Sequence, residues 1–185
     1  MGSLSDRLRF LRAFIAHPRQ VGAVLPTSRW AIRDMLDLAD VPGAELVVEL
    51  GAGTGVTTGE VLSRMKPGAR LIALEIDPKL SRLIEERYPD PRLTVVADTA
   101  ENIDEHSDGE KADVVVCALP FTSFPPSLRR RMLDLLPRLV TEQGSVVVIQ
   151  YSPIIQNELR KRFTTVERRI SPWNVPPAFL FRCSL

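Results

Sequence analysis

Short apolar runs alternate along the chain with segments whose apolar residues recur at helical spacing. Five runs, at 44–51, 70–77, 92–98, 112–120 and 144–151, predict buried strands because turn or polar residues bound each of them. Helices are predicted between them at 56–65, 78–88, 127–140 and 154–163, with Pro78 in a first turn and Ser127 as a cap. Buried strands that alternate with helices are typical of a parallel sheet covered on both faces.

Both ends of the chain depart from this alternation. Segments 164–170 and 178–185 have no helix between them, so we expect an antiparallel edge pair joined by a loop at 173–177, in a mostly parallel sheet of seven strands. Helices are expected at 3–18 and 28–39, joined by a loop. We divide the chain into N-terminal helices with a lid loop, 1–44, and a core, 45–185, within one domain.

Composition narrows the functional classes. The chain has 185 residues, 44% of them hydrophobic, which suits one globular domain, and its net charge of +1 gives no overall attraction to nucleic acid. Cys117 and Cys183 lie in apolar runs without metal-ligand spacing, so we expect buried thiols and no metal. No apolar run approaches the ~20 residues of a membrane span and no signal peptide is evident, so we expect a cytoplasmic protein. The oligomeric state is left open.

The stretch "VELGAGTG" carries an acid, Glu49, followed by Gly51, Gly53 and Gly55. A strand–glycine–helix turn brings backbone N–H groups and a helix N-terminus to a ligand. The spacing differs from G-x-G-x-x-G, and the lysine of a phosphate-binding loop is missing. A carboxylate at the end of the first strand repels phosphate, whereas it suits a ligand with an ammonium group.

Two further acids follow the next strands. Glu75 lies 20 residues after Gly55, where an acid binds ribose hydroxyls, and Asp98 is placed to accept a hydrogen bond from an adenine amino group. An ammonium, a ribose and an adenine without a required phosphate describe S-adenosylmethionine. The alternative is that these acids only cap helices.

At this point "VELGAGTG", "ALEID" and "VVADTAENI" resemble the class I S-adenosylmethionine-dependent methyltransferases, over about residues 45–185. The resemblance implies an α/β Rossmann-like fold and S-adenosylmethionine as the cofactor. With the acids and glycines above, we expect these residues to bind the cofactor: Leu25, Thr27, Ser28, Ile76, Thr99, Ala100 and Cys117.

The segment from Ala118 to Phe121, "ALPF", is similar to the Asn-Leu-Pro-Tyr motif of rRNA adenine dimethyltransferases, but Ala118 replaces the asparagine, which disfavours a nucleic-acid substrate. With "HPRQVGAVLPTS" and "SPWNVPPAFLFR", the chain more closely resembles the bacterial phospholipid N-methyltransferases. That resemblance implies methylation of phosphatidylethanolamine towards phosphatidylcholine. Methylation of RNA or a small molecule, and a non-enzymatic sensor of S-adenosylmethionine, remain alternatives.

Methyl transfer depends mainly on positioning, because the leaving group is already good. We expect the carbonyls of Ala118 and Leu119 to orient the amine, and the rings of Phe121 and Tyr151 to face the sulfonium or a methylated ammonium, with core packing as their alternative role. His17 and Tyr151 are candidates to hold the amine proton.

The N-terminal segment suggests contact with a membrane. "GAVLPTS", 22–28, is expected to close over the methionine end of the cofactor. The first helix places Leu4, Leu8, Leu11 and Ile15 on one stripe flanked by arginines, which is typical of helices at the surface of an anionic bilayer. We therefore expect peripheral association with phospholipid, although the stripe is equally able to pack on the sheet.

Overall fold

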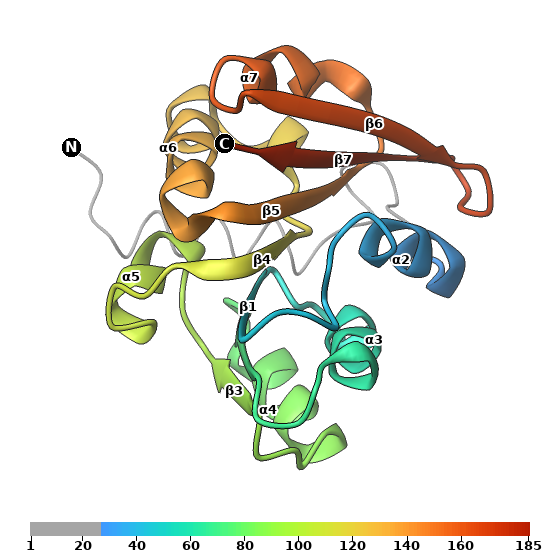
Figure 1. Ribbon diagram of the computed structural model, residues 1–185. Coiled ribbons are helices and arrows are strands. Elements are labelled where there is room, and N and C mark those ends of the chain that lie inside the picture. Colours follow the sequence, from blue (N-terminus) through green and yellow to red (C-terminus); the bar gives the residue numbers. More distant parts are fainter. Residues whose placement is uncertain (1–26) are drawn as a thin grey trace.

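A computed structural model describes residues 27–185. It confirms a seven-stranded sheet, in the order β3-β2-β1-β4-β5-β7-β6, which is parallel from β3 to β5 (Figure 1). β7 runs antiparallel to both its neighbours, so the expected edge pair is present. The strands are β1 (Leu46–Leu50), β2 (Arg70–Leu74), β3 (Leu93–Val96), β4 (Ala112–Cys117), β5 (Val140–Gln150), β6 (Thr165–Ser171) and β7 (Ala178–Ser184).

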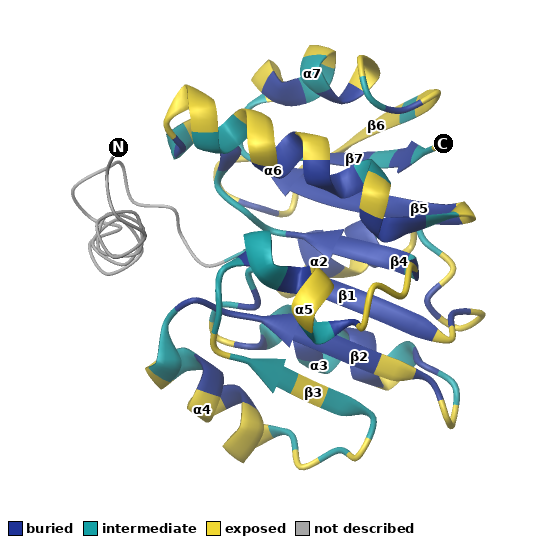
Figure 2. Cartoon of the chain, turned by 90° about the vertical axis from the view of Figure 1, so that its left-hand side faces the viewer, coloured by how far each residue is buried: buried dark blue, intermediate teal, exposed yellow. Residues whose placement is uncertain are grey.

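Helices cover both faces of the sheet, and the central strands are almost entirely buried (Figure 2). One face packs against α2 (Arg29–Leu36), α3 (Val56–Arg64) and α4 (Pro78–Arg87). The other packs against α5 (Ile103–His106), α6 (Pro126–Leu139) and α7 (Gln156–Arg160). The described residues also form three short 3₁₀ turns: η2 (Ala100–Asn102), η3 (Phe121–Ser123) and η4 (Pro153–Ile155).

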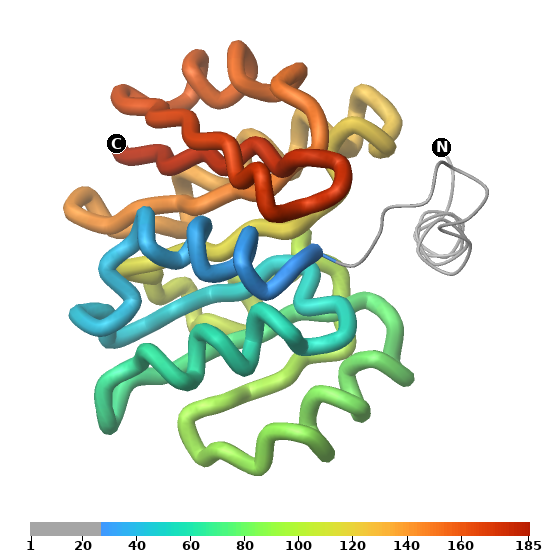
Figure 3. The backbone as a smooth tube through the Cα atoms, turned by 90° about the vertical axis from the view of Figure 1, so that its right-hand side faces the viewer, coloured from blue at the N-terminus to red at the C-terminus, as the bar shows by residue number. Residues whose placement is uncertain are grey.

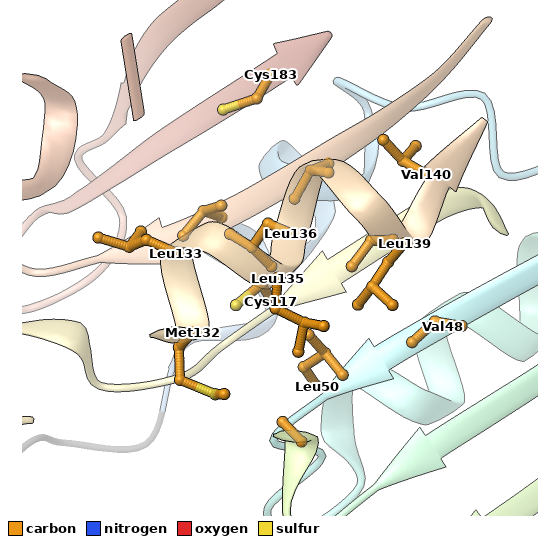
Figure 4. Close-up of a cluster of buried hydrophobic side chains, with 14 of the residues drawn as sticks. Val48, Leu50, Cys117, Met132, Leu133, Leu135, Leu136, Leu139, Val140 and Cys183 are labelled. Carbon is orange, nitrogen blue, oxygen red and sulfur yellow. The ribbon is translucent and has the colours of Figure 1, made fainter. Parts of the chain in front are cut away.

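The cluster beneath α6 contains the two cysteines. Leu133, Leu136 and Leu139 of α6 belong to the same buried cluster as Cys117 and Cys183 (Figure 4). Both thiols are free and buried, as expected, and burial raises their pKa to about 12. They therefore act as apolar core groups.

Two predicted boundaries were wrong. Ser127 does not cap α6, because the helix begins one residue earlier, at Pro126. Its N-cap residue, Pro125, forms no side-chain capping hydrogen bond. The fifth strand begins at Val140, which we had assigned to the preceding helix, since α6 passes into β5 without a loop. The helix predicted at 3–18 lies outside the described residues.

Candidate cofactor and acceptor site

A cleft opens at the carboxyl ends of the parallel strands, where the strand order reverses between β1 and β4. Its larger part has a volume of about 420 Å³. A smaller part, which we call the adenine slot, adjoins it, and the two share Gly51, Leu119 and Pro120. The larger part is lined by Thr27, Ile32, Gly51, Ala52, Gly53, Thr54, Val56, Thr57, Ala118, Leu119, Pro120, Thr122, Ser123, Ile149, Gln150 and Tyr151.

The glycine loop is held in place by Glu75. This carboxylate is 4% exposed and accepts hydrogen bonds from the backbone N–H of Gly53 at 2.7 Å and of Asp77 at 2.9 Å. Burial raises its pKa, although the two backbone N–H groups oppose that shift. Glu75 also lines the adenine slot, where a carboxylate can receive hydroxyl donors. One side chain therefore both fixes the loop and lines the adenine slot.

A side chain is disfavoured at two positions of the glycine loop, for different structural reasons. Gly53 has φ +59°, and a Cβ there would meet nothing within 4 Å, so a side chain would extend into the cleft that Gly53 lines. Gly55 has φ +79°, but a Cβ there would lie 2.9 Å from Cγ1 of Ile84. Gly55 thus permits α3 to pack on α4, and it contributes to the site only indirectly.

Glu49 is fully buried in β1, just before the glycine loop. Its Oε2 accepts a hydrogen bond from the Thr58 hydroxyl at 2.7 Å, whereas within residues 27–185 its Oε1 has no hydrogen-bond partner. Burial raises its pKa to about 7. Glu49 lines neither part of the cleft within residues 27–185. A buried carboxylate oxygen without a partner is costly, so we keep its pairing with a cationic group of the ligand as an expectation.

Asp98 lines the adenine slot and has three hydrogen-bond partners within the protein. Its oxygens accept hydrogen bonds from the backbone N–H of Thr99 at 2.7 Å, from Nδ2 of Asn102 at 3.1 Å and from Nε2 of His106 at 2.9 Å. Burial raises the pKa of Asp98, but these bonds outweigh it and lower the pKa overall. Asp98 lines the adenine slot mainly as the organiser of the turn that follows β3.

Apart from Thr99, the rest of the adenine slot within residues 27–185 is apolar. Ile76, Thr99 and Ala100 line it, as the sequence placed them. Phe124, Leu128 and Met132 also line it, and the sequence analysis missed them. The last two lie four residues apart on α6, so helical spacing was the only available signal, and it did not distinguish the slot from the core.

The acceptor end of the cleft gathers residues from β4, β5 and the start of α2. The Thr27 hydroxyl and the Tyr151 hydroxyl are hydrogen-bonded at 2.7 Å, which joins the segment before α2 to the end of β5. The Leu119 carbonyl already accepts hydrogen bonds from Phe121 N–H at 2.9 Å and from Gln150 Nε2 at 2.7 Å. Both of its lone pairs are engaged, so Leu119 is a poor choice to orient an amine.

Several predicted site residues lie away from the cleft surface. Phe121 is fully buried, with its ring edge-on to Phe124 at 6.0 Å, and Cys117 is fully buried in the core, so neither side chain reaches the cleft. Phe121 therefore has the alternative role given above, which is core packing. Ser28 caps α2 by accepting from Ala31 N–H at 3.1 Å. His17 and Leu25 lie outside the described residues.

Comparisons with known proteins agree with this geometry. Residues 47–144 match a family described as methyltransferase domain. The chain is 32% identical over 185 residues to an ornithine lipid N-methyltransferase of Singulisphaera acidiphila, covering 97% of this chain and 96% of that protein. It is 30% identical over 142 residues to a ribosomal RNA small subunit methyltransferase A of Leifsonia xyli, covering 74% of this chain and 48% of that protein.

Among solved structures, the fold is similar to that of a 1,6-didemethyltoxoflavin-N1-methyltransferase of Burkholderia thailandensis with bound S-adenosylhomocysteine. The TM-score is 0.74 at 17% identity, and the match covers 100% of this chain and 92% of that one. Within residues 27–185 there is no cluster of three metal-ligating side chains, and no helix there is long and apolar enough to cross a bilayer.

The cofactor expected from the strand-end acids is therefore confirmed as S-adenosylmethionine. The unpaired oxygen of Glu49 suits its ammonium group, Glu75 suits its ribose, and the apolar slot suits its adenine. The chain belongs to the class I methyltransferases that use S-adenosylmethionine.

Proposed function

We propose that the protein transfers methyl groups to the primary amine of a membrane lipid headgroup, at the surface of a bilayer. Similarity to an ornithine lipid N-methyltransferase over 97% of the chain supports a lipid amine. The stretches "ALPFTSFPP" and "SPWNVPPAFLFR" support phosphatidylethanolamine as the first lipid to test. Ornithine lipid is the second. Both present an alkyl amine beyond an acyl-chain region.

Gln150 is the observation that carries the N-methyl assignment. Its side chain is 4% exposed and lines the cleft at the end of β5. Nε2 donates to the carbonyls of Leu119 at 2.7 Å and Ile149 at 2.6 Å, which fixes the amide with its nitrogen towards both carbonyls. The amide oxygen is then left to accept a hydrogen bond from a substrate amine, the role for which Ala118 offers no side chain.

The lining of the larger part of the cleft also suits an amine that has lost its proton. All of the side chains that line it within residues 27–185 are uncharged. An alkyl ammonium has a pKa of about 10 in water, and removal from water lowers that pKa because the charged form is poorly solvated. Entry into this cleft therefore favours the neutral, nucleophilic amine.

The chemical step then needs only alignment. The amine nitrogen forms a bond to the methyl carbon as the carbon–sulfur bond breaks, and the bonding electron pair returns to sulfur. The alkylated ammonium loses its proton to water before a further methylation. Gln150 and the Ala118 carbonyl beside Gly51 would orient the nitrogen, and Tyr151 would close the same end of the cleft.

The proposal is tested with methyl-labelled cofactor and separate vesicles that contain phosphatidylethanolamine, ornithine lipid or phosphatidylcholine alone, with ribosomal RNA in parallel. We expect label in a lipid amine and S-adenosylhomocysteine in equal amount. Label in RNA alone would favour the rRNA methyltransferase alternative and refute a lipid substrate. Cofactor binding without any S-adenosylhomocysteine would indicate a sensor.

Gln150→Leu should lower kcat/KM roughly tenfold, since one hydrogen bond contributes about 0.5–1.5 kcal/mol, more when the donor develops charge. Cofactor affinity measured by calorimetry should change little. Gln143→Leu is the matched control, because Gln143 lies on the same strand but is exposed at its other end. Unchanged turnover in Gln150→Leu would remove Gln150 from the acceptor site.

A further inference from the structure

Large apolar side chains are exposed mainly at one place in residues 27–185. Seven large apolar side chains are exposed within this range, and the five most exposed lie on or beside the β6–β7 hairpin: Trp30 at 62%, Ile154 at 68%, Ile170 at 53%, Trp173 at 69% and Val175 at 73%. We call these five residues the hairpin rim. The other two, Leu83 and Leu185, are exposed by 38% and 41% and lie elsewhere in the sequence.

The members of the rim are brought together by hydrogen bonds between distant segments. Ser28 N–H, next to Arg29 and Trp30, donates to Oδ1 of Asn174 at 2.7 Å. On the other side of the hairpin, Nη1 of Arg168 donates to Oε1 of Gln156 at 3.0 Å, which joins β6 to the first residue of α7, directly after the turn η4 that carries Ile154. Figure 3 shows the hairpin loop beside the first residues of α2, at one end of the molecule.

The hairpin loop is built to hold two side chains outward. Asn174 is 2% exposed, and its Nδ2 donates to the carbonyl of Pro176 at 2.8 Å, so this residue anchors the loop from within. Its neighbours Trp173 and Val175 are among the most exposed apolar side chains described. Exposure of a tryptophan and a valine to water is unfavourable, and the anchored loop keeps both side chains exposed. We therefore expect a partner that covers them.

The rim lies at the same end of the sheet as the cleft. β5 and β6 both run antiparallel to β7, so they share a direction, and their carboxyl ends face the same way. Tyr151 of the cleft follows β5, while Trp173 follows β6. Thr27, which is hydrogen-bonded to Tyr151, is three residues before Trp30. A surface that covered the rim would therefore meet the mouth of the cleft.

The charges beside the rim are basic. Arg29 and Arg169 are exposed, and neither forms an ion pair within residues 27–185. Asp34, the acid of α2 nearest in sequence to Trp30, is turned to the hydroxyl of Ser171. Tryptophan at the headgroup level with neighbouring arginines is the composition of proteins that enter an anionic bilayer surface. A protein partner would need a broader complementary surface than a loop tip.

We infer that the hairpin rim docks the protein on an anionic lipid bilayer, with Trp173 and Val175 in the interface and the mouth of the cleft facing the headgroups. This docking surface rests on the proposed function, since a lipid substrate must be reached within a bilayer. It uses other residues than the helix predicted at 3–18, which lies outside the described residues.

The two tryptophans of the chain allow a direct test. Trp30→Phe leaves Trp173 as the only tryptophan. In this variant, vesicles that contain phosphatidylglycerol should shift tryptophan emission to shorter wavelength, and lipids brominated on the acyl chain should quench it. Trp30→Phe/Trp173→Phe/Leu83→Trp is the matched control, because its reporter lies on α4 and should remain unquenched.

A second variant, Trp173→Ala/Val175→Asp, measures the contribution of the rim. It should lower the vesicle partition coefficient about tenfold or more, because apolar burial is lost and a charge is placed in the interface. Cofactor binding, followed by calorimetry, should be unchanged.

The inference is overturned if Trp173 stays unquenched while the protein sediments with vesicles, because another segment then makes the contact. It is equally overturned if the parent binds no vesicles, or if Trp173 emission shifts with protein concentration alone, which would indicate a second copy. Methyl transfer to lipid in detergent micelles tests the proposed function separately. Methyl transfer to lipid without binding of the rim to vesicles would refute only the docking role of the hairpin rim. Binding of the rim to vesicles without methyl transfer would refute only the lipid substrate.

Discussion

Glu49 combines full burial, one hydrogen bond and one oxygen without a partner within residues 27–185, so we expect its protonation to be coupled to cofactor binding. Burial raises its pKa from 4.5 to about 7, so the free folded protein holds a proton that the unfolded chain releases near pH 4.5. Through this group, stability falls as pH rises from about 4.5 to about 7. We expect cofactor binding to have the opposite pH dependence, since an ammonium group that pairs with Glu49 requires the ionised carboxylate.

Affinity for S-adenosylmethionine should therefore rise with pH below about 7, by up to about tenfold per pH unit, with release of a proton on binding. The cofactor's own amino group stays charged there, because its pKa is about 8. Calorimetry in buffers of different ionisation enthalpy measures both effects. Glu49→Gln should bind more weakly and without this dependence. An affinity that is independent of pH between roughly 5.5 and 7 would mean that Glu49 does not pair with the ammonium.

At the scale of elements, the backbone conformation of the glycine loop between β1 and α3 determines whether the cofactor has room to bind. Gly53→Val should abolish cofactor binding, because the new side chain occupies the cleft. Gly68→Val is the control. Gly68 also has a left-handed φ, +84°, and a Cβ there would also meet nothing within 4 Å, but it lies in the loop before β2. Each variant costs about 1–2 kcal/mol in backbone strain. Equal losses of affinity in both variants would contradict this placement.

Helices and strands were predictable from the sequence where the turn and cap residues and the pattern of apolar positions indicate the same boundary. The apolar runs at 70–77 and 112–120 became β2 and β4, and Pro78 begins α4 with Asp77 as its N-cap. The start of α6 was missed because Ser127 is a good cap by type, whereas the chain had already turned helical at Pro126. Gln150 was missed because an amide at a strand end has no pattern of its own. Its role depends on the loop after β4, which only the folded sheet brings beside it.

At the scale of the whole molecule, the site is assembled from segments that are far apart in the chain. Residues from the start of α2 to the end of β5 line one cleft, and Glu75 of the second strand–helix unit fixes the loop of the first. A ligand that binds only this assembly stabilises the entire fold by mass action.

S-adenosylhomocysteine at about 100 times its Kd should add about 2.7 kcal/mol, which raises Tm by about 5–10 °C for a domain of this size. The parent and Gly68→Val should show this shift in calorimetric melting, although Gly68→Val starts from a lower Tm. Gly53→Val should start similarly low and show no shift. Trp173→Ala/Val175→Asp should show the full shift, because the hairpin rim lies outside the cofactor cleft. If it did not, the hairpin would be a structural part of the cofactor site, and its exposed tryptophan would need an explanation other than a membrane.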